Sequence, residues 1–164
     1  MKQQVALLVV AATLFSGLTH AHGTGHRARA PVAPADAEQT AFGIAGDPDN
    51  ISRTIVVGMS DAMRFSPASL EIKQGGTIKF VVKNGGKLEH EMVLGRMEDL
   101  KKHAELMRRF PHMEHDESHM AHVGPGTSDE LVWRFNRSGE FYFGCLIAGH
   151  LEAGMIGKIV VSDR

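Results

Sequence analysis

The sequence contains little cysteine and no excess of charge of either sign, and each shortage excludes a class of protein. Its 164 residues include a single cysteine, Cys145, so an intramolecular disulfide framework is excluded. The 18 basic residues are balanced by 19 acidic residues, so nucleic acid is not an expected partner. With 43% hydrophobic residues, the chain has enough apolar material for one domain of about 100 residues plus extensions.

Long hydrophobic runs are absent as well. The apolar stretch from Val5 to Phe15 is too short to span a membrane comfortably. Lys2 precedes it and small residues up to Ala21 follow it, which is the pattern of a secretory signal peptide at residues 1–21. An uncleaved N-terminal anchor is the alternative. Because no lipid-attachment cysteine is present, we expect a cleaved signal, export to the periplasm and no membrane anchor.

The next stretch, residues 22–51, begins with histidines and continues with alanine and proline. Such a composition cannot bury an apolar face, so a flexible extension is predicted, with ordered structure beginning near Ser52. If the chain is cleaved after Ala21, the new α-amine would form a Cu(II) chelate with His22 and His26.

From Ser52 onward, short stretches are rich in β-branched residues or alternate between apolar and polar residues. Glycine pairs at residues 75–76 and 85–86 separate some of them, as tight turns do between strands. This pattern predicts an all-β sandwich or barrel for residues 52–164. The expected strands are residues 54–57, 70–73, 77–83, 90–94, 130–135, 140–143 and 156–161.

One segment, in an insertion at about residues 96–126, has the periodicity of a helix instead. Acidic residues lie in its expected first turn and basic residues in its last turn, in keeping with the helix dipole. Pro111 should end the helix. The apolar face repeats every three or four residues and consists of Met97, Leu100, Ala104, Met107 and Phe110.

The sharpest chemical signal is the spacing Cys-x4-His-x4-Met formed by Cys145, His150 and Met155. A thiolate, an imidazole and a thioether on one loop form a soft ligand set, and His90, which opens an expected strand, is the natural second imidazole. This set favours copper and electron transfer, whereas zinc sites are built from thiolate, imidazole and carboxylate ligands and not from thioethers. The alternatives are an inert buried thiol, a core methionine, a core histidine, or a cysteine nucleophile assisted by His150.

These residues resemble the cupredoxins, the blue copper proteins related to plastocyanin and azurin. The resemblance covers residues 52–163 outside the helical insertion, and includes the motif at residues 63–67 and the turn at residues 73–77. It implies a Greek-key β-sandwich with copper at one end. The ligands that it implies are His90, Cys145, His150 and Met155.

Two positions differ from the pattern of many cupredoxins. Glu91 stands where an asparagine usually follows the first histidine, and Ala148 stands where a proline usually precedes Gly-His. Both positions adjoin the ligands, and groups next to ligands adjust the potential and spectrum of a metal centre. The resemblance therefore implies the ligands, while a standard blue spectrum does not follow.

A histidine- and methionine-rich segment directly follows the expected helix. Imidazole and thioether donors suit Cu(II) and Cu(I), so we expect a second copper-binding region here. As a helix, the segment would place its four histidines on one face, and as a loop it would wrap an ion. A solvated polar loop is the alternative, because Glu114, Asp116 and Glu117 lie among the donors. The candidate accessory ligands are His112, Met113, His115, His119, Met120 and His122.

These additions bear on the choice between functions. The chain is similar to the copper-tolerance branch of the cupredoxins, which carries His- and Met-rich additions. That likeness implies a periplasmic protein that buffers copper or captures and oxidises Cu(I). The alternative is an electron carrier for a respiratory or denitrifying oxidoreductase, with a redox partner protein. Repeated His-x-His patterns, typical of a trinuclear copper cluster, are missing, so we do not expect an enzyme that reduces oxygen.

Overall fold

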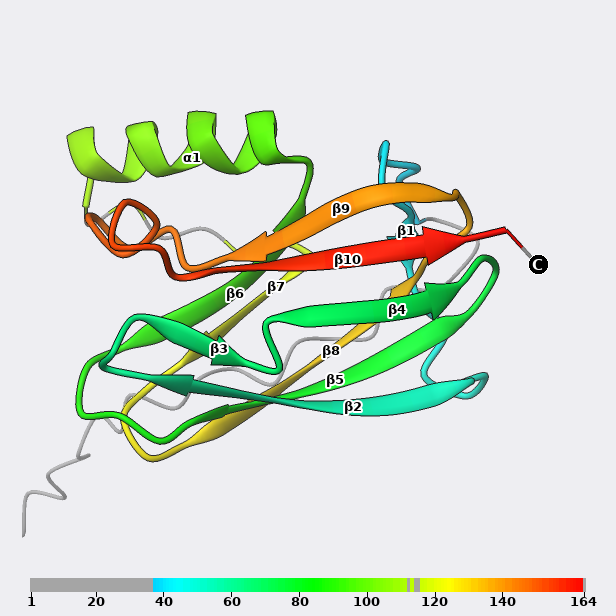
Figure 1. Ribbon diagram of the computed structural model, residues 1–164, viewed down its shortest axis with the longest axis horizontal. Helices are drawn as coiled ribbons and strands as arrows, with labels where there is room; N and C mark the ends of the chain where they lie inside the picture. The colour runs from blue at the N-terminus through cyan, green and yellow to red at the C-terminus, as the bar shows by residue number, and fades with distance from the viewer. Residues whose placement is uncertain (1–36, 112, 114–115, 164) are drawn as a thin grey trace, which may run out of the picture. The chain divides into compact units, whose positions relative to one another are not determined.

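The structure, a computed structural model, describes residues 37–111, 113 and 116–163, and this part of the chain contains a β-sandwich (Figure 1). Two five-stranded sheets form the sandwich, and one helix follows the sixth strand, which confirms the predicted fold class. Within these residues, no helix is long and apolar enough to cross a bilayer. The expected signal peptide and the histidines His22, His26, His112 and His115 lie outside the described residues.

The first sheet has the strand order β1-β8-β5-β2-β3. Its central strand, β5, pairs in parallel with β2 and antiparallel with β8. In β2 the buried residues Ile55, Val57 and Met59 occupy every second position, because successive side chains of a strand point to opposite faces. The strands are β1 (Ile44–Ala45), β2 (Arg53–Ser60), β3 (Arg64–Ser66), β5 (Thr77–Asn84) and β8 (Ser128–Arg134).

The second sheet has the strand order β4-β10-β9-β6-β7. Strand β6 runs antiparallel to β9, so the start of β6 and the end of β9 lie at the same end of the sheet. His90 is the first residue of β6, and Cys145 directly follows the last residue of β9. The strands are β4 (Ser69–Lys73), β6 (His90–Gly95), β7 (Met120–Val123), β9 (Gly139–Gly144) and β10 (Ile156–Ser162).

Aromatic side chains fill much of the core between the sheets. Phe80, Trp133 and Phe143 are fully buried, and the rings of Phe65 and Phe143 meet edge to face with their centroids 4.9 Å apart. Phe143 also packs against the backbone of β10 so closely that a Cβ at Gly157 would lie 2.1 Å from its ring. Only glycine fits at this position, directly after the strand begins.

Helix α1 (Met97–Arg109) forms where the apolar periodicity predicts it, and Figure 1 shows it above β9. Leu100, Ala104 and Met107 are buried, and they form a second apolar cluster with side chains that include Leu146. Phe110 differs from the expectation, because it is 57% exposed and lies beyond the last helical turn. The buried face of the helix therefore ends at Met107.

The chain joins the sandwich earlier than the expected start at Ser52. Strand β1 pairs with β8, although it lies within the segment expected to be flexible. Phe42 anchors this stretch: its ring stacks on Trp133 with centroids 5.2 Å apart, and its carbonyl oxygen accepts a hydrogen bond from Trp133 Nε1. The alanine- and glycine-rich composition conceals this anchor, because a single buried aromatic residue can fix a short segment that has no periodic pattern.

Candidate metal centre

His90 and two residues of a loop more than 50 positions later, Cys145 and His150, place their donor atoms together at one end of the sandwich. One ring nitrogen of His90, one ring nitrogen of His150 and the Sγ atom of Cys145 lie within 4.8 Å of one another. Cys145 Sγ is 3.2 Å from His150 Nδ1, and the two imidazole centroids are 5.0 Å apart. Two imidazoles and one thiol at these distances form a compact set of soft and borderline donors, which suits copper.

His90 has the environment of a metal ligand. Its side chain is fully buried, and its Nδ1 atom has no hydrogen-bond partner among the described residues. Leaving a buried nitrogen without a partner costs free energy, so such an atom calls for an explanation. A metal ion between the three donors would satisfy it. The reading of His90 as a core histidine with satisfied nitrogens therefore does not fit the structure.

Asp61 holds the other nitrogen of the His90 ring. Its Oδ1 atom is 3.2 Å from His90 Nε2, and its two oxygens also accept hydrogen bonds from the backbone N–H groups of Lys87 and Leu88. These backbone hydrogen bonds lower the pKa of Asp61, with a smaller contribution from His90. A carboxylate bound to the outer nitrogen of a ligating histidine fixes its tautomer and orientation.

The turn before His90 is shaped around this carboxylate. A Cβ atom at Gly86 would lie 2.0 Å from Asp61 Oδ1, so the turn needs glycine at this position. Asn84, which is buried, accepts the N–H of Gly86 and donates to the carbonyl oxygen of Leu88. Asp61 was not predicted from the sequence, since it lies far from His90 in the chain and no local pattern distinguishes it from other turn aspartates.

The neighbouring donors Cys145 and His150 have pKa values shifted in opposite directions. Burial raises the pKa of the Cys145 thiol to about 12, although the N–H group of Glu91 donates to its sulfur. Burial and the nearby His90 lower the pKa of His150. Near neutral pH the thiol is thus protonated in the absence of metal, and a nucleophilic enzyme would need a thiolate. The chemistry fits a metal ligand better than a nucleophile.

The loop between β9 and β10 carries three of the four expected ligands and is closed by backbone hydrogen bonds. The N–H of Cys145 donates to the carbonyl oxygen of Met155, and the N–H of Met155 donates to that of His150. Met155 is fully buried in the main core cluster. From β3, Arg64 donates a hydrogen bond of 3.0 Å to the carbonyl oxygen of Ala153. The loop is therefore anchored at both ends and in its middle.

The histidine- and methionine-rich segment does not form a comparable cluster within the described residues. Helix and loop were the two alternatives for this segment, and its last part adopts neither, because Met120 to Val123 form strand β7 beside β6. Met120 is 3% exposed and packs with residues such as Leu100, so its thioether lies in an apolar cluster, and its role as an accessory ligand stays a prediction. Apolar burial against α1 explains this position, since the thioether serves equally well as a core side chain.

The remaining described donors of this segment have separate surroundings. His119 lies 3.3 Å from a carboxylate oxygen of Glu117, and its ring meets Phe42 edge to face. His122 Nδ1 lies 3.2 Å from Glu91 Oε2. Met113 is 44% exposed. Among the described residues, only His90, Cys145 and His150 bring three or more His, Cys, Asp or Glu donors together, so the accessory site stays a prediction.

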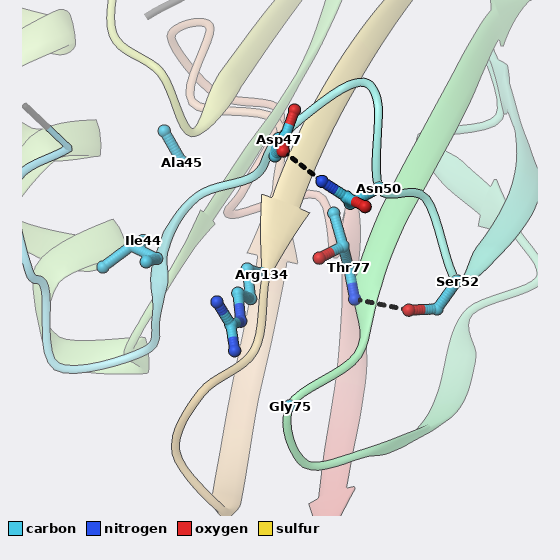
Figure 2. A pocket seen from close by; sticks show the side chains of 8 residues that line it. All are labelled: Ile44, Ala45, Asp47, Asn50, Ser52, Gly75, Thr77 and Arg134. Atoms are coloured by element: carbon cyan, nitrogen blue, oxygen red, sulfur yellow. Dashed lines mark hydrogen bonds between the residues drawn. The ribbon is translucent and has the colours of Figure 1, made fainter. Parts of the chain in front are cut away.

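A second candidate site, a small polar pocket, lies at the other end of the sandwich (Figure 2). Strand β5 runs between the two sites. The pocket lies beside its first residue, Thr77, and its last residue, Asn84, bonds to the turn before His90. Asp47 and Asn50 are hydrogen-bonded within it, as are Ser52 Oγ and the N–H of Thr77. Its lining contains no histidine, cysteine or methionine, so it offers no soft metal ligands.

Comparisons with known proteins agree with this geometry. A family model described as copper binding proteins, plastocyanin/azurin family, matches residues 53–162. A copper-resistant cuproprotein CopI from Rubrivivax gelatinosus is 46% identical over 160 residues, which are 95% of this chain and 94% of that protein. The copper-resistant cuproprotein CopI of Vibrio cholerae serotype O1 is 33% identical over 163 residues, covering 93% and 96% of the two chains.

A solved structure shares the fold. Reduced auracyanin from the photosynthetic bacterium Roseiflexus castenholzii matches with a TM-score of 0.59 and 20% identity, covering 68% of this chain and 98% of that one. At this identity the likeness shows the fold alone.

Proposed function

Because the chain belongs to the plastocyanin/azurin family of copper-binding proteins, we propose that it is a periplasmic type 1 copper protein that acts in copper resistance. The observation that carries this proposal is the convergence of His90, Cys145 and His150, together with the buried His90 Nδ1, which has no hydrogen-bond partner within the described part of the chain. The copper-resistance role is supported by relatives named CopI, which match nearly the whole chain.

Each ligand has a defined part in holding copper. His90 would bind through Nδ1, Cys145 through its sulfur and His150 through the nitrogen that faces this sulfur, while the Met155 thioether would add a weak fourth bond. Copper in such a set supplies one-electron chemistry between Cu(II) and Cu(I). The protein excludes water with the buried His90 and Cys145 and orients the His90 ring through Asp61.

The same proposal includes Cu(I) capture by the histidine- and methionine-rich segment. Because Met120 is buried, the first half of this segment is the better candidate for Cu(I) capture. It contains His112, Met113 and His115 in the sequence, and Met113 is exposed. This half follows α1, whose last turn lies beside the ligand loop, with Arg108 3.7 Å from Glu152. The type 1 centre could accept an electron from Cu(I) held by this segment as a substrate, or could receive the ion itself.

Copper titration of the mature full-length protein tests both parts, with visible absorption and bound metal measured together. We expect more than one copper per chain, and loss of the extra copper in the variant His112→Ala/Met113→Ala/His115→Ala. The control Glu114→Gln/Asp116→Asn/Glu117→Gln removes the acidic neighbours and should keep the extra copper, because thioethers and imidazoles are the soft donors.

The outcomes separate the candidate functions. A single copper that saturates the coloured site, together with unchanged copper tolerance of the host carrying the triple alanine variant, would favour an electron carrier that serves a redox partner. Absence of any coloured copper site in the wild-type protein would refute the whole proposal.

The N-terminal chelate is a separate element of the proposal. It needs a free α-amine on His22, together with the imidazoles of His22 and His26. Acetylation of His22 in a peptide of residues 22–30 should weaken Cu(II) binding, and an unchanged affinity would refute this site. Determination of the N-terminus of the exported protein tests both the cleavage after Ala21 and the periplasmic location.

A further inference from the structure

Glu91 is a fully buried carboxylate directly behind the copper ligands, at 1% exposure. Its Oε1 atom accepts a hydrogen bond of 2.8 Å from the N–H of Leu146, next to Cys145. Its Oε2 atom faces His122 Nδ1 at 3.2 Å. A buried charge is costly unless it is paired and hydrogen-bonded, and both oxygens of Glu91 meet this requirement. The side chain thus joins β6, the ligand loop and β7.

The backbone of Glu91 contacts the site as well. Its N–H donates to Cys145 Sγ at 3.4 Å. Glu91 therefore contacts the ligand Cys145 with its main chain, and it contacts Leu146, the residue after Cys145, with its side chain. An N–H aimed at a thiolate sulfur withdraws charge from it and adjusts the potential of the metal. The placement of this N–H depends on the side-chain bonds of Glu91, because they fix β6 against the loop.

We propose that Glu91 and His122 form a positioning pair that sets the reduction potential of the copper centre and connects it to the strand that ends the histidine- and methionine-rich segment. This inference rests on the proposed copper site. The Glu91 carboxylate places a negative charge near the metal, which favours Cu(II) over Cu(I). The His122 N–H offsets part of this charge. His122 is therefore assigned to Glu91 rather than to an accessory copper.

A purely structural pair would behave differently from a pair that acts on the potential. If Glu91 and His122 only held β6 and β7 together, loss of either residue would loosen the same contact and move the potential in the same direction. If they act through charge, the two losses have opposite signs. Loss of the carboxylate favours Cu(I) and raises the potential, whereas loss of the His122 N–H leaves the carboxylate uncompensated and lowers it.

The test measures the reduction potential and absorption spectrum of copper-loaded full-length variants, all at one pH. Glu91→Gln should raise the potential, because its amide oxygen still accepts the Leu146 N–H without the charge. His122→Phe should lower it, and His122→Gln should return it towards the wild-type value, because an amide N–H can replace the imidazole donor. The control Glu130→Gln removes an exposed carboxylate that pairs with Lys79, and should leave the potential unchanged.

A double variant makes the test sharper. In the Glu91→Gln background, His122→Phe should lose most of its effect on the potential, because no charge remains to be offset. Shifts in the same direction, or shifts no larger than that of Glu130→Gln, would overturn the inference. If Glu91→Gln does not take up copper, the comparison of His122→Phe with His122→Gln decides. Failure of the wild-type protein to bind copper would instead refute the proposed function.

Discussion

Two regions of the chain are rich in histidine and methionine, and the structure treats them differently. At the end of the sandwich, His90 at the start of β6 meets Cys145 and His150 of the ligand loop, and the three donors lie within 4.8 Å of one another. In the segment that ends in β7, donors adjacent in the sequence have different surroundings: Met120 enters an apolar cluster, while His122 faces Glu91. A local concentration of donor residues in the sequence is therefore a poor guide to a shared site.

The reason is the geometry of a strand. Neighbouring residues of a strand point to opposite faces, so Ala121 packs in the core between the sheets, while Met120 and His122 lie on the other face. On that face Met120 packs in the apolar cluster with α1, and His122 pairs with Glu91 of the neighbouring strand. A ligand set instead needs side chains that converge from several elements. The antiparallel pairing of β6 with β9 provides that convergence, since it brings the start of one strand to the end of the other.

The largest expected effect separates the two regions by colour. Cys145→Ser should abolish the strong visible absorption and lower copper affinity at this site more than about 100-fold, because loss of a ligand costs more than loss of an outer partner. Met113→Leu should leave this absorption intact. Optical titration with Cu(II) measures both variants, and an intact spectrum in Cys145→Ser would contradict the assignment of the ligands.

A stability measurement tests whether Met120 is a core residue or a ligand. Met120→Ala should lower the free energy of unfolding by about 2–5 kcal/mol, because it leaves a cavity beneath α1. Met113→Ala, at an exposed position, should change it by less than about 0.5 kcal/mol. Urea unfolding of the metal-free proteins gives both values. A copper-dependent phenotype of Met120→Ala at unchanged stability would instead support its role as a ligand.

The next expected effect concerns Asp61, which holds both His90 and the turn before it. Asp61→Asn should lower copper affinity about 10–100-fold, because its amide group cannot accept the backbone N–H bonds with both atoms and holds the His90 ring less firmly. Asp47→Asn is the matched control. Asp47 also accepts a backbone N–H in a turn, at the opposite end of the sandwich. Equal losses in both variants would indicate a general effect on folding.

The smallest expected effect is a proton count. The pKa of Cys145 is raised to about 12, so the thiol keeps its proton below that pH, and copper binding as a thiolate must release it. The lowered pKa of His150 leaves its imidazole neutral near pH 7, so it adds little. Calorimetry in buffers of different ionisation enthalpy should therefore give about one proton released per copper. Copper affinity should rise about tenfold per pH unit in this range.

Much of the fold was predictable because its signals are local. Alternation identified the main strands, and the repeat of Leu100, Ala104 and Met107 identified α1. The structure also begins β6 at His90 and brings the side chains of Cys145 and His150 together, as expected. Both features were predictable because turns and ligand loops carry their own sequence pattern. Strand β7 was missed, because four residues with two adjacent buried side chains show no alternation.

The supporting residues of the metal centre were beyond sequence analysis for a different reason. Asp61 reaches His90 from another strand connection, and His122 reaches Glu91 across a sheet edge. Such contacts depend on the packing of elements that are distant along the chain, and a single sequence contains no record of them. Glu91 alone left a signal, as a departure from the family pattern.

The insertion of α1 has a consequence for anyone who would trim this chain to a minimal sandwich. Adjacent residues of the ligand loop belong to different apolar clusters: Cys145 packs between the sheets, whereas Leu146 packs under the helix. The ligand loop is thus packed on both sides, against the core between the sheets and against the helix. Removal of the insertion would take away the packing partners of Leu146 on one side of the loop. The inserted helix therefore helps to hold the metal ligands in place.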